Sequence, residues 1–319
     1  IAKFYDAQRK TVVAPYDTGA HGTHTVGTMI GGDRVNVPIG MAPEARMVGT
    51  AAMGGYSVML TGMQWILEPD ANDPSLTPRA VNNSWNSGGA PDPELFYNAI
   101  EAWEAAGILP VFSAGNAGPD YQTITTPHEH PLAFAIGATG ASGSIAKFSS
   151  RGPGIYHGQK TEKPDVTAPG VDINSTLPSP QGGTTNPNGY FGKYSGTSMA
   201  APHITGGSAL LFQIDPRLTP PQIRAIFQTT ATPRARDQYS QPNGWNEVYG
   251  HGKVNFEKAV AVAFAIKKRN SLGDLAQFIG LNTTDDLTAS FIEAQGRSEK
   301  FTLSRLSDTG NWIAAKDLQ

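Results

Sequence analysis

The segment Gly196–His203, which reads GTSMAAPH, constrains the fold more than any other part of the sequence. Gly196 allows a tight backbone turn, and the small and apolar residues that follow it as far as Phe212 favour a buried helix. The Ser198 hydroxyl would then lie in the first helical turn, beside unpaired N–H groups and the positive end of the helix dipole. That position suits a nucleophile whose reaction produces negative charge, and it equally suits an ordinary N-cap serine.

Two other glycine-rich segments carry side chains that would complete a site for acyl transfer. The segment Gly19–Thr28 contains His21 within the run HGTHTVGT. The segment Leu109–Pro119 is a short apolar strand followed by a glycine turn that presents Asn116. A serine, a histidine and a primary amide can act as nucleophile, general base and oxyanion donor. The three segments together therefore favour catalysis over a plain helix cap.

These motifs resemble those of the subtilisin (subtilase) family of serine proteases, close to its bacillopeptidase F-like branch. The resemblance runs from about Ile1 to Phe264 and follows the order of motifs in the family. It also rests on Gly40–Ala45 (GMAPEA), Val81–Trp85 (VNNSW), Phe148–Pro153 (FSSRGP), Lys163–Gly170 (KPDVTAPG) and Tyr249–Asn255 (YGHGKVN). It implies a secreted hydrolase of the peptidase S8 class that functions in proteolysis. Such an endopeptidase cleaves polypeptides by a Ser/His/Asp acyl-enzyme mechanism.

The resemblance also assigns roles to single residues. Ser198 corresponds to the nucleophile and His21 to the general base. Asn116 corresponds to the side-chain donor of the oxyanion hole, and the Ser198 N–H would be the second donor. His24 and His203 correspond to positions that are structural in the family.

The resemblance further predicts where the substrate backbone lies. The expected contacts are Ser84, Trp85, Gly88 and Gly89 after one strand, and Ser113, Ala114 and Gly115 after the next. Gly88 and Gly89 would allow a peptide to approach closely, and the alternative is a plain glycine turn. Asn86 stands where many relatives have glycine, so the shape of this pocket differs in detail.

The catalytic aspartate of the family has no counterpart at the expected place. The family carries it at the end of the first core strand, well before the histidine, yet only 20 residues precede His21. Asp17 lies in a loop without an apolar strand before it, and Asp6 fits the strand that follows the missing motif. We therefore expect the chain to lack the N-terminal segment with the first strand and the aspartate. A weakly active fragment, or a pseudoprotease that binds peptides, is the alternative function.

Other kinds of site fit the sequence less well. Asp17 and Asp308 both begin an Asp-Thr-Gly tripeptide, but their flanks are not the apolar strand arms of an aspartic protease. The acid-active serine-carboxyl relatives carry glutamate in place of His21 and aspartate in place of Asn116. A metal site at His21 and His24 lacks a further ligand at a suitable spacing. The resemblance thus favours a serine protease of neutral to alkaline pH.

Apolar runs alternate with helical patterns along the chain. Strands are expected at residues 45–50, 80–83, 108–113 and 132–138, and helices at 21–30, 57–67, 93–106, 198–212, 220–229 and 254–267. The alternation implies a three-layer α/β fold, a mostly parallel sheet with helices on both faces. Ligands of such folds bind at the carboxyl ends of the strands, where Asn116 would emerge. We expect a peptidase domain at residues 1–270 and a C-terminal extension at 271–319, which would be the start of a β-rich accessory domain or a packed tail.

Composition narrows the partners and the compartment. The net charge of −3 argues against nucleic acid or an anionic membrane as partner, and no apolar run approaches the ~18 residues of a transmembrane helix. The absence of cysteine excludes disulfides and thiol catalysis, and with the resemblance it fits a bacterial secreted or cell-envelope protein. No cofactor is required. Asp33 and Asn36 lie in a stretch that is expected to be a solvated turn or, as the alternative, a structural calcium site. A missing N-terminal segment or propeptide is a further candidate partner.

Overall fold

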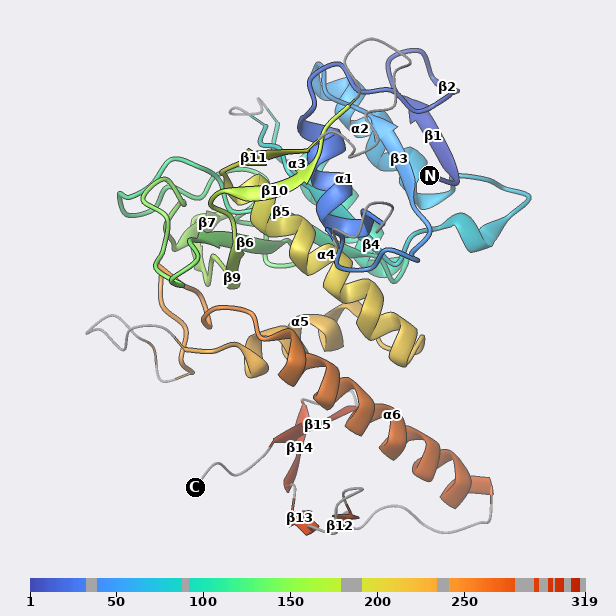
Figure 1. Cartoon of the computed structure of the whole chain (residues 1–319), viewed down its shortest axis with the longest axis vertical. Coiled ribbons are helices and arrows are strands. Elements are labelled where there is room, and N and C mark those ends of the chain that lie inside the picture. The colour runs from blue at the N-terminus through green and yellow to red at the C-terminus, as the bar shows by residue number, and fades with distance from the viewer. Residues whose placement is uncertain are drawn as a thin grey trace.

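The computed structural model describes residues 1–32, 39–87, 92–178, 191–233, 241, 243–278 and four short strands between residues 290 and 315, with side chains as far as Ser271 (Figure 1). Its larger sheet is parallel throughout. The order of its strands is β4 (Ala80–Asn83), β5 (Leu109–Ser113), β6 (Phe134–Thr139) and β9 (Val166–Pro169). Every residue of β5 and β6 is buried, as expected for strands covered on both faces.

A second, smaller sheet lies beside the first. In it β1 (Lys3–Asp6) runs parallel to β3 (Val48–Ala51) and antiparallel to β2 (Thr11–Val12), in the order β2-β1-β3. Within the described part of the chain, β3 and β4 are each the last strand of their own sheet and do not pair with each other. The mostly parallel sheet that the sequence predicts is therefore present, but it is interrupted between β3 and β4.

Helices cover the parallel sheet on both faces. On one face, α2 (Tyr56–Leu67) and α3 (Glu94–Ala105) form a hydrophobic core together with Phe112 of β5 and Ile108 just before it. On the other face lie α4 (Thr197–Ile214), α5 (Pro220–Thr230) and α6 (Phe256–Phe278), which share a second core with β6 and β9. None of the helices in the described residues is long and apolar enough to cross a membrane.

Helix α4 lies at the centre of the molecule and is buried on nearly all sides (Figure 1). It contacts β4, β5, β6 and β9, and also α1 (His21–Ile30) and α6. Glycines allow the closest of these contacts, since a Cβ at Gly206 would collide with Met29 of α1 and one at Gly207 would collide with Phe256 of α6. A helix that is apolar all round is expected to be buried in this way.

The remaining elements are short hairpins. They are β7 (Gly154–Tyr156) with β8 (Gln159–Thr161), β10 (Ile173–Thr176) with β11 (Phe191–Tyr194), β12 (Ser290–Ile292) with β13 (Ser298–Lys300) and β14 (Thr302–Leu306) with β15 (Asn311–Ala315), together with a 3-10 turn at Pro74–Leu76. The division of the chain at residue 270 stays a prediction, although α6 continues across that position.

The expected helices and strands are all found, with ends that shift by a few residues, except at α6. The sequence predicts that this helix ends at residue 267 after a basic cluster, but it continues to Phe278. The prediction was wrong because residues 268–278 contain no proline, and the single Gly273 weakens a helix by only about 1 kcal/mol.

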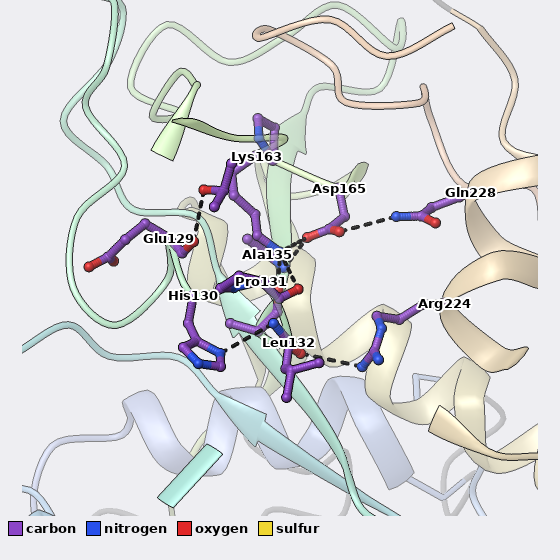
Figure 2. A network of polar contacts seen from close by, with 12 residues as sticks. Glu129, His130, Pro131, Leu132, Ala135, Lys163, Asp165, Arg224 and Gln228 are labelled. Carbon is purple, nitrogen blue, oxygen red and sulfur yellow. Dashed lines mark hydrogen bonds and ion pairs between the residues drawn. The ribbon is translucent and has the colours of Figure 1, made fainter. Parts of the chain in front are cut away.

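A buried ion pair connects three segments that are far apart in the sequence (Figure 2). The Lys163 ammonium donates to the Ala133 carbonyl and, at 2.8 Å, to Asp165 Oδ2. The same carboxylate accepts the Ala135 N–H at 2.8 Å and the Gln228 side-chain amide of α5 at 3.1 Å. Burial lowers the pKa of Lys163, and the Asp165 carboxylate acts in the opposite direction. The pair thus holds β6, β9 and α5 together.

We expect Lys163→Met to lower the free energy of unfolding by about 3–5 kcal/mol, because it leaves a buried carboxylate without its cation. Urea unfolding followed by tryptophan fluorescence measures this loss. The matched control is Lys160→Met on β8, where the lysine is exposed and the change should stay within about 0.5 kcal/mol. Equal unfolding midpoints for the two variants would contradict the role given to the ion pair.

Candidate active site

Ser198 is the second residue of α4, so its N–H lies in the first turn, where the helix offers no acceptor. The Ser198 Oγ lies 3.4 Å from the Ser84 carbonyl oxygen, and the Ser84 hydroxyl donates to the Ser198 carbonyl at 2.9 Å. The Gly196 N–H donates to the Gly170 carbonyl at 2.8 Å. The end of β4 and the turn after β9 therefore hold this end of α4, where the Ser198 N–H has no hydrogen-bond partner among the described residues.

Asn116 follows β5 and reaches the same helix end. Its Oδ1 accepts both the N–H and the hydroxyl of Thr197, each at 2.9 Å. The Thr197 oxygen in turn accepts the Gly115 N–H at 3.1 Å. Because a backbone N–H can only donate, these contacts assign Oδ1 and leave Nδ2 as the free donor. A Cβ built on Gly196 would lie 3.7 Å from this Nδ2, so the amide group faces the turn that precedes Ser198.

His21 is the first residue of α1 and is exposed. Partial desolvation of its ring lowers the pKa of His21, the neighbouring His24 lowers it further, and Asp17 raises it. Among the residues that the structure describes, no carboxylate is hydrogen-bonded to the His21 ring. The imidazole is therefore neutral over a wider pH range than an ordinary histidine, which suits a proton acceptor.

Ser198, Asn116 and His21 line the same cavity. It has a volume of about 330 Å³ and is lined by His21, Asn116, Lys193, Tyr194, Ser195, Gly196, Ser198 and Met199. Sequence reasoning missed the contribution of Lys193, Tyr194 and Ser195. Their only signal in the sequence is that they directly precede Gly196. A hydroxyl, an imidazole and a primary amide thus line one solvent-accessible cavity.

His24 attaches the β10–β11 hairpin to the helix that carries His21. Its Nε2 lies 2.9 Å from the Ile173 carbonyl oxygen and 3.1 Å from that of Gly192. Its ring stacks on Tyr194 with the centroids 4.6 Å apart. In α4, His203 Nδ1 similarly lies 2.9 Å from the Met199 carbonyl oxygen. Both histidines therefore bind backbone within the fold. No group of three or more histidine, aspartate or glutamate side chains in the described residues could hold a metal ion.

The described residues that are predicted to contact substrate lie at or just after the ends of β4 and β5. Trp85 packs on Phe96 and Phe112, with centroids 5.6 Å away in each case. The side chains of Ser113 and Ala114 are buried, whereas Gly115 is partly exposed. Gly115 has φ +101°, which requires glycine, and a Cβ there would lie 2.8 Å from Ser150 Oγ.

Some predicted sites cannot be placed. Gly88 and Gly89, and the candidate calcium ligands Asp33 and Asn36, lie outside the described residues. The contacts of Ser84, Trp85 and Ser113–Gly115 with a substrate stay predictions.

Residues 4–252 match the family model described as Subtilase family. The chain belongs to the subtilase family. This subtilase is 39% identical over 264 residues to bacillopeptidase F of Bacillus subtilis (strain 168). The match covers 78% of this chain and 17% of bacillopeptidase F. It is 34% identical over 273 residues to serine protease AprX of the same strain (77% and 59%), and 32% identical over 253 residues to its subtilisin E (77% and 57%). The chain thus spans less than two thirds of the length of each of these relatives.

The two aspartates near the start of the subtilase chain both bind backbone. Asp6 ends β1 and accepts the Arg9 N–H at 2.9 Å and the Tyr16 hydroxyl at 3.0 Å. Asp17 Oδ2 accepts the N–H and the hydroxyl of Thr23, each at 2.7 Å, while its Oδ1 accepts the Gly19 N–H at 2.9 Å. Asp17 therefore caps the first turn of α1 and acts on His21 through its charge.

We expect Asp17→Asn to lower the pKa of His21 further, because it removes the nearby negative charge that favours the imidazolium. Asparagine keeps an oxygen that can accept the Thr23 N–H, so the start of α1 should be retained. NMR titration of the histidine ring protons measures the change. The His24 resonance serves as internal control, since Asp17 is not among the groups that shift its pKa. An unchanged His21 titration would show that Asp17 only caps the helix.

Proposed function

We propose that this chain carries the reactive centre of a serine endopeptidase that hydrolyses peptide bonds in polypeptides. The observation that supports this most directly is the cavity that His21, Asn116 and Ser198 line together. These residues come from the start of α1, the turn after β5 and the start of α4. A fold that only binds peptides needs no hydroxyl, imidazole and amide at one point.

The residues divide the chemistry between them. Ser198 Oγ bonds to the scissile carbonyl carbon while His21 takes its proton, and Asn116 Nδ2 and the Ser198 N–H stabilise the oxyanion. His21 then gives the proton to the departing amine as the C–N bond breaks, which leaves an acyl group on Ser198. Water repeats the sequence on the acyl group, releases the acid and restores the serine. The N-terminal end of α4 favours the negative charge at each tetrahedral stage.

Labelling with a fluorophosphonate, followed by peptide mapping, tests this function. We expect the label on Ser198 and none on the Ser198→Ala variant, which should keep its fold. We also expect Asn116→Ala to slow labelling, because removing one oxyanion donor costs about 10²–10³-fold in rate, a magnitude measured in subtilisin. A label on another residue, or equal labelling of Ser198→Ala, would overturn the assignment.

A carboxylate that orients His21 is the part that the described site does not provide. We propose that the break between β3 and β4 is where a further strand brings it. A cavity of about 270 Å³ lies at this break, and the residues just before β3 and just before β4 line it, among them Met47 and Arg79. Met29 of α1 and Gly206 of α4 also line it. Both strands thus begin at the cavity, and β4 leads to Ser84, whose carbonyl lies beside the Ser198 hydroxyl.

We expect a form of the chain extended upstream of Ile1 by an apolar strand that ends in aspartate to be labelled about 10⁴-fold faster. That magnitude is the one measured in a serine protease for loss of the orienting aspartate. The matched control carries asparagine in place of the added aspartate, so that strand insertion and the charge are separated. Equal labelling rates for the two extended forms would contradict the role of the carboxylate and favour a peptide-binding pseudoprotease.

A further inference from the structure

The cavity at Ser198 contains a positive charge that the proposed reaction does not use. Of the described residues that line it, Lys193 is the only lysine or arginine. Lys193 lies on β11, is exposed and stands opposite Asn174 of β10. An exposed side chain on the wall of the cavity can reach a ligand that occupies it.

No described residue forms an ion pair with Lys193. Asp172 precedes β10, the strand that pairs with β11, and Asp17 precedes α1, the helix that β10 contacts. Asp17 accepts hydrogen bonds from Gly19 and Thr23 at the start of α1. The Asp172 backbone N–H binds Ser195 Oγ at 2.9 Å; among the described residues its carboxylate forms no ion pair with Lys193. An acidic ligand would therefore meet an uncompensated cation.

The position of β11 shows which half of a peptide Lys193 would face. The β10–β11 hairpin is attached to α1 through His24, Ser175 and Thr176, whose hydroxyl donates to the Thr23 carbonyl at 2.9 Å. It therefore lies on the side of His21, which protonates the departing amine. Asn116 and Ser84 approach Ser198 from the sheet. Lys193 thus faces the residues that follow the scissile bond.

We propose that Lys193 selects an acidic side chain, aspartate or glutamate, at the first or second residue after the scissile bond. This inference rests on the proposed function, since it assigns a specificity to the same cavity. An exposed ion pair is weak, so the preference for glutamate over glutamine is expected to be about threefold at low salt. It should be nearly lost at about 1 M salt, where the Debye length is about 3 Å.

The test uses the Ser198→Ala variant, which binds peptides without cleaving them. A fluorescent neutral decapeptide carries one glutamate, or one glutamine as its match, at each position in turn, and fluorescence anisotropy gives the affinities. We expect the glutamate preference at one or two adjacent positions, and its loss in Lys193→Met/Ser198→Ala. Lys160→Met/Ser198→Ala is the control, because it removes an exposed lysine that does not line the cavity, and it should keep the preference.

Cleavage-site mapping on an unfolded protein gives the same comparison if the peptides bind too weakly to measure. Acidic residues should be enriched just after the cuts made by the native chain, and not after those of Lys193→Met. Equal affinities for glutamate and glutamine, or a preference that survives Lys193→Met, overturn the role of Lys193 and leave the protease function intact. No cleavage, together with no fluorophosphonate label on Ser198, overturns the protease function itself and the specificity with it.

Discussion

The burial of helix α4 is the constraint on which the site depends. The parallel sheet and the helices α1 and α6 pack on it, and Gly206 and Gly207 allow α1 and α6 to approach it closely. Its first turn is held by Gly170, Asn116 and Ser84, which come from three segments distant in the sequence. A side chain at this position loses little further conformational entropy when it is held for a reaction, because the core already immobilises the backbone that carries it.

The local surroundings of the candidate site residues could be predicted from the sequence because short motifs describe them. Ser198, His21 and Asn116 each stand within two residues of a glycine at or near the end of an element, and the helix starts at residues 21 and 197 lie within one residue of the expected positions. The buried pair Lys163–Asp165 was visible only as part of a motif. Its other partners, Ala133 and Gln228, are too far along the chain for any periodic pattern to connect them.

What the sequence did not predict depends on pairing over long distances. The β10–β11 hairpin joins residues 173–176 to residues 191–194 and brings Lys193 into the cavity, yet neither strand is apolar or alternating enough to be recognised. The position of the break between β3 and β4 was also hidden. It results from which edges pair, whereas composition and periodicity report only that strands exist.

The two open strand edges also affect how the molecule behaves towards its own copies. An edge strand presents a row of unpaired N–H and C=O groups, which can pair with a strand from another molecule. In the described chain β3 and β4 place two such edges beside one apolar cavity, which would shelter an inserted segment from water. Self-association through β-addition is therefore the characteristic hazard of this chain at high concentration, and filling the break would suppress it.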